Sequence, residues 1–281
     1  MATRGCPSRC TFCVAKRLQE FNSKGRVRSA DSLIRELKEL KEKYFIDSFY
    51  FMDDLFTLNK DNVKRFCSLL KSEKMDLVWG CSSKVSTLNE EIIRVMAHAG
   101  CIQIDFGVER GSDNALRLMK KGQNIRMVKD IFSLCHKYGI RTFANMLVNL
   151  PGETESDLTD IVKLLNEIYS DVVSINIFTP YPGTEIYDQG KYKFQKEEYA
   201  NLSKDITWLM EVSPDKFKYC SHTVNLASWV SRYSRKFNKI LPNLKFYATR
   251  KYWNVLFKSK VKTNYFKQFN LLVKEFVNQK F

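Results

Sequence analysis

The sequence has little that would place it in a membrane or outside a cell. None of its apolar runs approaches the ~18 consecutive residues that a helix needs to cross a bilayer, and residues 1–5 do not form a signal peptide. It also lacks internal repeats and low-complexity segments, while 44% hydrophobic residues suffice for a folded core. We therefore expect a cytoplasmic protein whose reducing surroundings keep its cysteine thiols free.

Paired metal ligands are scarce as well. The chain has three histidines, which make no pair with one another, and five of its eight cysteines are isolated. A structural zinc site usually takes a second pair of ligands at short spacing, and a disulfide framework is not expected in a long chain without a secretory signal. The isolated cysteines are Cys67, Cys81, Cys101, Cys135 and Cys220.

The other three cysteines lie within eight residues, as Cys6, Cys10 and Cys13, with Phe12 just before the last. Thiolates at this C-x3-C-x2-C spacing can surround one soft metal centre. A four-iron cluster normally takes four cysteines, so three leave one iron free to bind a substrate or cofactor. The alternative, a structural zinc site, would want a fourth ligand. The motif therefore predicts an iron–sulfur cluster held by these three cysteines.

Beyond residue 26, helical and strand patterns alternate along the chain. Thr87 and Glu90 form a capping-box pattern that predicts a helix start. A serial β/α array of this kind builds a parallel sheet with helices outside, open or closed into a barrel, and in barrels the chemistry lies at the C-terminal ends of the strands. Strands are expected at residues 49–52, 77–83, 101–108, 140–148 and 172–178, with a stub at residues 2–4.

The cysteine motif resembles the signature of the radical S-adenosylmethionine (SAM) superfamily. Three further motifs support this resemblance in the expected order, namely GVE at residues 107–109, PGET at 151–154 and PYPGT at 180–184. The resemblance covers roughly residues 3–190. It implies a partial (β/α)6 TIM-type barrel, a [4Fe–4S] cluster with Cys6, Cys10 and Cys13 as ligands, and reductive cleavage of SAM to a 5′-deoxyadenosyl radical.

The resemblance also implies contacts to SAM near the first strands. The backbone at Phe12 would approach the adenine. Asp53 and Asp54, at the end of the second strand, match an acidic element that accepts a hydrogen bond from the SAM amino group. The alternative for these aspartates is a cap on the following segment.

Further contacts are implied at the fourth and fifth strands. Glu109 and Asn145 match residues that bind the ribose hydroxyls, and Lys121 matches a cation that pairs with the SAM carboxylate, the alternative being a solvated charge. Arg110 departs from the small residue usual after the glutamate. Asn149 stands where relatives often have glycine, and its side chain would narrow the adenine site.

The motif set is most similar to the cobalamin-associated, Mg-protoporphyrin-ester-cyclase-like subgroup. That subgroup carries an N-terminal cobalamin-binding domain whose Asp-x-His-x-x-Gly motif is absent here, so cobalamin would come only from a further domain or a partner. The expected function is a radical SAM enzyme of unassigned substrate, with methyl transfer, cyclisation or oxidative chemistry as options. A tRNA-modifying methylthiotransferase-like enzyme is an alternative.

We divide the chain into a radical SAM core at residues 1–195 and a helical, basic C-terminal segment at residues 196–281. Residues 201–281 hold 16 lysines and arginines against 4 acidic residues, interleaved with aromatic residues. This mix suits RNA or an anionic membrane surface, and a catalytically degenerate iron–sulfur protein that binds one of these is the second alternative. We favour instead a packed helical cap over the open edge of the barrel. An active enzyme would also need a reductant such as flavodoxin or ferredoxin.

Overall fold

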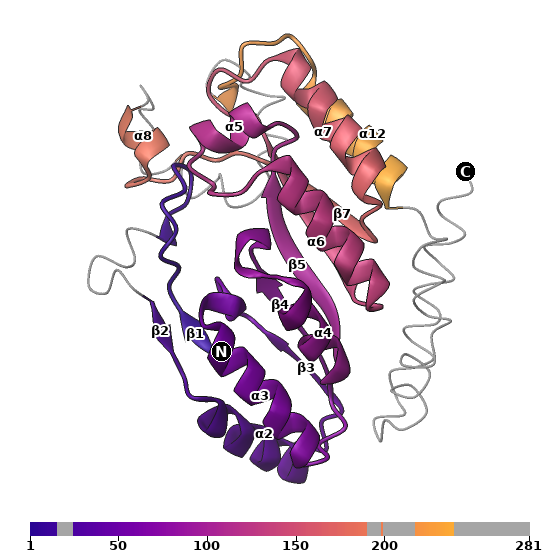
Figure 1. Cartoon of the computed structure of the whole chain (residues 1–281). Coiled ribbons are helices and arrows are strands. Elements are labelled where there is room, and N and C mark those ends of the chain that lie inside the picture. Colours follow the sequence, from indigo (N-terminus) through magenta and orange to yellow (C-terminus); the bar gives the residue numbers. More distant parts are fainter. Residues whose placement is uncertain (16–24, 190–197, 199–216, 239–281) are drawn as a thin grey trace.

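The computed structural model describes residues 1–15, 25–189, 198 and 217–238 (Figure 1). Its centre is a five-stranded parallel sheet in which the strands follow one another in sequence order. Each strand is joined to the next through at least one helix, as predicted for a β/α array. The strands are β3 (Ser48–Phe51), β4 (Val78–Ser83), β5 (Cys101–Glu109), β6 (Arg141–Val148) and β7 (Val172–Ile177).

The predicted strand stub does not join this sheet. Residues Thr3–Arg4 form β1, which pairs antiparallel with β2 (Arg26–Val27). The carboxylate of Asp53, just beyond β3, accepts hydrogen bonds from the backbone N–H groups of Ala2 at 3.0 Å and Thr3 at 2.9 Å. The Asp53 side chain thus accepts the N–H groups that strand pairing would otherwise use. A sixth parallel strand is absent from the described residues.

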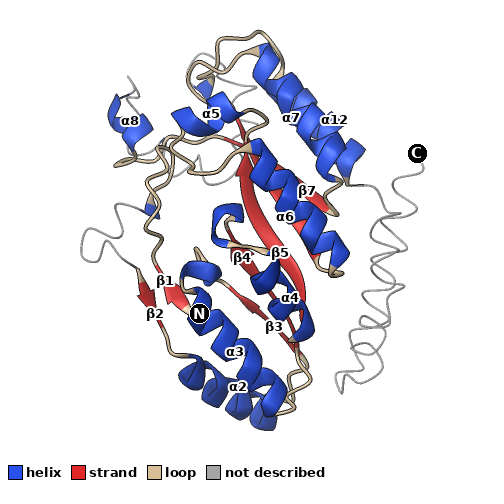
Figure 2. Ribbon diagram, in the orientation of Figure 1, coloured by secondary structure: helices blue, strands red, loops and turns tan. Residues whose placement is uncertain are grey.

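The helices lie side by side along one face of the sheet (Figure 2). Neighbouring helices pack in the order α2, α3, α4, α6 and α7. None of the described helices is long and apolar enough to cross a membrane. Their bounds are α2 (Ala30–Tyr44), α3 (Lys60–Ser72), α4 (Glu90–His98), α6 (Ile125–Lys137) and α7 (Glu155–Ile168).

The helix starts follow side-chain capping, with one difference from the prediction. Helix α4 begins at Glu90, and its N-cap is Asn89, whose side chain accepts from the N–H of Ile92. Thr87 instead ends the short 3-10 helix η2 (Val85–Thr87) and donates to a carbonyl within that turn. The capping box predicted at Thr87 is therefore wrong, because an asparagine closer to the helix supplies the acceptor.

The core between sheet and helices is continuous and rich in aromatic side chains. Phe51, Phe56 and Phe66 surround Trp79, with ring centroids 5.4 to 5.9 Å from the indole. Along β6 every second residue is buried, and the alternate ones, including Asn145, are half-buried. This period of two separates the core face of the sheet from the face that carries the polar site residues.

Helix α12 (Leu226–Phe237) covers the edge strand β7. The side chain of Asn238, just after the helix, accepts from the N–H of Val173 and donates to its carbonyl, both at 2.7 Å. This blunts an edge that would otherwise present free backbone groups. The described part of the predicted C-terminal segment is thus a packed cap. The rest of that segment, which contains Phe246, Tyr252, Trp253 and Phe257, lies outside the described residues.

Candidate active site

The three-cysteine loop follows β1 and is held at the C-terminal edge of the sheet. The N–H of Thr11 donates to the carbonyl of Met119 at 3.1 Å, and the carbonyl of Thr11 accepts from Ile186 at 3.0 Å. These contacts tie the loop to the ends of two segments, α5 (Asp113–Leu118) and α8 (Glu185–Gln189). All three cysteines are free thiols, Cys10 buried and the other two partly exposed.

The electrostatic surroundings of the loop suit an anionic metal centre. Burial raises the pKa of the Cys10 and Cys13 thiols, while the positive charge of Lys121 acts on both in the opposite direction. Lys84 acts on Cys10 in the same sense as Lys121. Metal binding requires deprotonated thiols, and two nearby ammonium groups offset the charge that three thiolates bring together.

Glu109 and Lys121, predicted on opposite ends of SAM, form a buried ion pair. Lys121 Nζ donates to Glu109 Oε1 at 2.7 Å, and the two side chains are only 10% and 12% exposed. Lys121 Nζ also lies 5.5 Å from the centroid of the Phe12 ring. Burial lowers the pKa of Lys121, but Glu109 together with the negative charges of Cys10 and Cys13 outweighs it, and the net shift is upward. The alternative of a solvated charge for Lys121 is therefore wrong.

The backbone around Glu109 explains this placement. Glu109 has φ of 70°, in the left-handed region that side chains rarely adopt. A Cβ added at Gly107 would lie 2.5 Å from Glu109 Oε1 and 2.7 Å from Lys121 Nζ. The ion pair thus sits directly over Gly107, and only a glycine leaves room for it.

Asn145 lies on the neighbouring strand, paired in register with Gly107 on one side and Ser174 on the other. Its side chain is half-buried, and Nδ2 donates to the carbonyl of Phe106 at 3.4 Å. The structure therefore brings Asn145, Glu109, Lys121 and Phe12 to one region beside the cysteine loop.

The two aspartates after β3 differ in their surroundings. Asp53 is buried, and both its oxygens are used by the backbone of the N-terminal segment. Burial raises the pKa of Asp53 in spite of these hydrogen bonds. Asp54 is exposed. The structure thus gives Asp53 a role in positioning the strand that leads into the cysteine loop, and a SAM contact from either aspartate stays a prediction.

Sequence reasoning missed Lys84, which follows β4. Its Nζ donates to Ser8 Oγ in the cysteine loop at 3.1 Å. Burial lowers the pKa of Lys84, and the charge of Lys121 lowers it further, so the net shift is downward. The signal was present, because Lys84 is a polar residue at the C-terminal end of a predicted strand, like the other candidates.

Arg110 and Asn149, the two departures from the expected pattern, point away from the predicted SAM contacts. Arg110 is buried and forms an ion pair with Glu153 of the PGET turn, and a second with Asp157 at 3.3 Å. The side chain of Asn149 bonds the backbone of Phe217 and Tyr219 in the C-terminal segment. Arg110 therefore links the end of β5 to the PGET turn and α7, and Asn149 links the end of β6 to the C-terminal segment.

The PGET turn leads directly into helix α7. Thr154 and Asp157 form a reciprocal capping box at the start of α7.

The residues present fit the group that the motif implies. Three free thiols lie on one loop, two lysines offset their charge, and hydrogen-bonding side chains from β5 and β6 lie beside them. Three thiolates leave one position of a four-iron cluster open. The arrangement suits a cluster with an exchangeable ligand that is both charged and polar.

Comparison with known proteins agrees with this geometry. The family model described as the radical SAM superfamily matches residues 1–165. An uncharacterised methyltransferase of Pyrococcus horikoshii is 32% identical over 67% of this chain and 40% of its own length. The anaerobic magnesium-protoporphyrin IX monomethyl ester cyclase of Rubrivivax gelatinosus is 24% identical over 66% of this chain and 33% of its own length. The chain thus spans less than half of these curated relatives.

Among solved structures, the radical SAM methyltransferase TsrM from Kitasatospora setae, with cobalamin and a [4Fe-4S] cluster bound, superimposes with a TM-score of 0.60. It is 21% identical, over 67% of this chain and 38% of its own. This likeness shows the fold, a partial TIM-like barrel, as predicted. Because the family model matches 165 of 281 residues, the chain belongs to the radical SAM superfamily.

Proposed function

We propose that the chain is the catalytic core of an enzyme that binds a [4Fe–4S] cluster through Cys6, Cys10 and Cys13 and uses it with SAM. When both are bound, the cluster supplies the electron that cleaves SAM to methionine and a 5′-deoxyadenosyl radical. The observation that carries the proposal is the meeting of the cysteine loop with the Glu109–Lys121 pair at one edge of the sheet.

In this proposal, the ion pair is the part of the site that SAM rearranges. Lys121 would bind the SAM carboxylate, and Glu109, with Asn145, would accept from the ribose hydroxyls. Phe12 would lie beside the adenine, and Asp54 is exposed enough to accept from the amino group. The contact between Glu109 and Lys121 supports this, since a buried carboxylate and a buried ammonium keep each other charged until ligand groups replace them.

The reaction class we propose is methyl transfer, with cyclisation or oxidative chemistry as the other options from the sequence. Relatives named as methyltransferases favour it. A cobalamin-dependent reaction would need a further domain or partner. Radical SAM enzymes need a reductant, and we propose flavodoxin or ferredoxin in the cytoplasm.

The test is anaerobic reconstitution with iron and sulfide, reduction with dithionite, and assay of SAM for 5′-deoxyadenosine. Cys6→Ala, Cys10→Ala and Cys13→Ala should each abolish the cluster and the product. Cys67→Ala, on the buried face of α3, is the matched control and should retain both.

Two results would point elsewhere. Stoichiometric zinc without iron would reject the cluster. A fully loaded cluster that yields no 5′-deoxyadenosine with any reductant would favour the catalytically degenerate alternative. Binding of RNA or anionic vesicles by residues 196–281 is then tested by deleting residues 241–281 and measuring association at low salt.

A further inference from the structure

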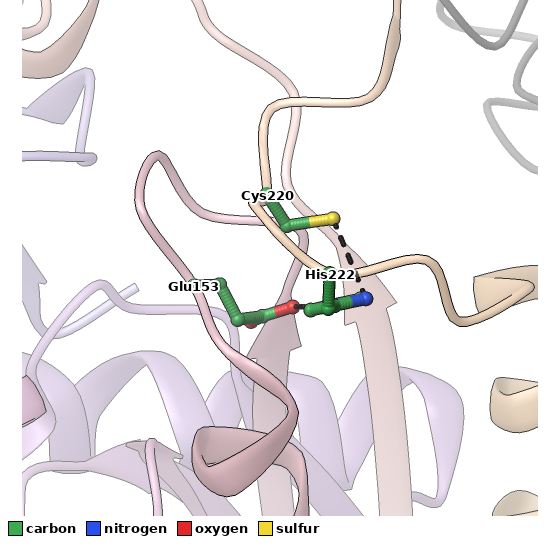
Figure 3. A group of neighbouring side chains, drawn as sticks. All are labelled: Glu153, Cys220 and His222. Atoms are coloured by element: carbon green, nitrogen blue, oxygen red, sulfur yellow. Dashed lines mark hydrogen bonds and ion pairs between the residues drawn. The ribbon is translucent and has the colours of Figure 1, made fainter.

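A second cluster of reactive side chains lies where the C-terminal segment meets the PGET turn. Cys220, His222 and Glu153 bring one ligand-type atom each to within 4.8 Å of one another (Figure 3). Glu153 comes from the turn after β6, and the other two from the segment before α12. The spacing Cys220-Ser221-His222 is visible in the sequence, but its partner is 69 residues away.

The three side chains form a compact group in which the imidazole contacts both the thiol and the carboxylate. Cys220 Sγ lies 3.8 Å from His222 Nδ1, and His222 Nε2 lies 2.8 Å from Glu153 Oε1. Glu153 Oε1 also accepts from the N–H of Asn149 and Oε2 from the guanidinium of Arg110, so both oxygens act as acceptors and His222 Nε2 is the donor. Nδ1 is then an acceptor that faces the thiol.

Glu153 is held firmly in this position. Its oxygens accept from the N–H of Asn149 at 3.0 and 3.1 Å, and it forms a buried ion pair with Arg110. The side chains of His222 and Glu153 are 3% and 0% exposed, whereas Cys220 is partly exposed. A buried base with a buried orienting carboxylate therefore faces a thiol that solvent molecules can reach.

The geometry disfavours a metal ion as the occupant. The carboxylate oxygens of Glu153 are already engaged, Oε1 by the N–H of Asn149 and by His222 Nε2, and Oε2 by the guanidinium of Arg110, which leaves little capacity for a metal ion. The guanidinium of Arg110 already neutralises Glu153. The arrangement is instead that of a nucleophile, a base and a group that orients the base.

We propose that Cys220 is a thiol–disulfide exchange site, with His222 as its proton acceptor, Glu153 as the positioning residue, and a small organic disulfide as its substrate. The thiol proton passes to His222 Nδ1 as the sulfur attacks one sulfur of the disulfide. The S–S bond of the substrate breaks, and the departing sulfur takes the proton. The products are a mixed disulfide at Cys220 and one small thiol, so electrons balance without another oxidant.

A disulfide suits this group better than a carbonyl substrate. Exchange needs a thiolate and a proton for the leaving sulfur, and Cys220 with His222 supplies both. Attack on a carbonyl needs additional hydrogen-bond donors to the oxyanion. Burial and the charge of Glu153 raise the pKa of the Cys220 thiol, and Lys218 opposes them. The thiol is thus protonated at rest, and reaction depends on His222.

A group attached to Cys220 would alter side-chain packing near the cysteine loop. Tyr219, the residue before Cys220, packs at 6.0 Å against Phe178, in a small apolar cluster that also includes Phe12. A group attached to Cys220 would separate its sulfur from His222 and disturb the segment that holds Tyr219 there.

The experiment uses the full chain, loaded with its cluster under anaerobic conditions and treated with oxidised glutathione. Mass spectrometry of peptides gives the rate of adduct formation at each cysteine. Cys220 should react, and His222→Gln should slow its reaction by at least about tenfold, since a positioned base contributes typically ~10²–10⁴-fold. His136→Gln, the same change in a histidine that faces Asp171 at 3.6 Å, is the control and should leave the rate unchanged.

A measurement on the unaltered chain covers the case in which His222→Gln does not fold. With His222 taking the thiol proton, the rate should rise by clearly less than tenfold per pH unit, whereas a thiol that must first lose its proton to water gains tenfold per pH unit. Equal rates in the parent chain and His222→Gln, or a continuous tenfold rise with pH, would overturn the proposal. So would one zinc per chain that Cys220→Ser removes.

Discussion

The proposed binding of SAM by Glu109 and Lys121 can be tested by adding one methyl group at Gly107, the residue over which the pair lies. In Gly107→Ala the new Cβ would lie 2.5 Å from Glu109 Oε1 and 2.7 Å from Lys121 Nζ, whereas ordinary contacts begin at 3.4 Å. The carboxylate must therefore retreat by about 0.9 Å and the ammonium by about 0.7 Å. Both groups would leave the positions from which they would bind SAM.

The size of the effect follows from the charged hydrogen bonds that SAM would lose. A hydrogen bond to a charged group contributes about 1.5–3 kcal/mol, so the loss of one weakens binding roughly 10- to 150-fold. Both atoms are the far ends of flexible side chains that can move aside, so the free energy of unfolding should fall by less than the ~1–3 kcal/mol typical of overpacking. The cysteines are untouched, so the iron content should not change.

The assay is calorimetric titration of SAM into cluster-loaded protein, with denaturant unfolding alongside. Gly139→Ala is the matched control, because its Cβ meets nothing within 4 Å while its φ of +68° makes alanine strained. That variant should lose about 1–2 kcal/mol of stability and keep its affinity for SAM. A folded, cluster-loaded Gly107→Ala that binds SAM within twofold of the parent chain would refute our assignment of Glu109 and Lys121.

Three further predictions rest on single contacts. Asp53→Ala should cost about 1–3 kcal/mol and reduce iron incorporation by freeing the strand before the cysteine loop, whereas the exposed Asp54→Ala should leave iron content unchanged. Arg110→Met should lower the urea-unfolding free energy by about 3–5 kcal/mol, because Glu153 would stay buried without the guanidinium that balances its charge, and a loss below 1 kcal/mol would contradict this. Burial raises the pKa of Asp171 but its hydrogen bonds lower it more, leaving it below 3.8. Its stabilisation is therefore present above pH 3.8 and lost as pH falls through the lowered value, so the stability difference between the parent chain and Asp171→Asn should shrink in acid.

Much of the fold was predictable because it depends on patterns within short stretches. The strand positions followed from apolar runs that end in polar residues, and all five central strands were found close to their predicted places. The failures were also local in origin. Asn89 caps α4 where Thr87 was predicted, and the two-residue β1 pairs with the equally short β2 and not with the parallel sheet.

The candidate site was predictable to a smaller extent. Glu109 and Asn145 were found together because the carboxyl ends of neighbouring parallel strands meet at one edge, and Phe12 joins them because the cysteine loop is held at that edge. Lys84 obeys the same rule and was overlooked. The contact between Glu109 and Lys121 was not expected, since it depends on the left-handed backbone at Glu109 and the open space over Gly107.

The sequence by itself determined the three-cysteine loop, the order of strands and helices, and membership of the superfamily, because these depend on spacing along the chain. Only the tertiary structure decided how the charged side chains are paired. Asp53 accepts a hydrogen bond from the first strand, and Arg110 forms an ion pair with Glu153. His222, 69 residues away in the sequence, forms a hydrogen bond with the same glutamate. A charge that is removed from water needs an opposite charge or a hydrogen-bond donor beside it. Which group fills this role depends on what the fold places nearby.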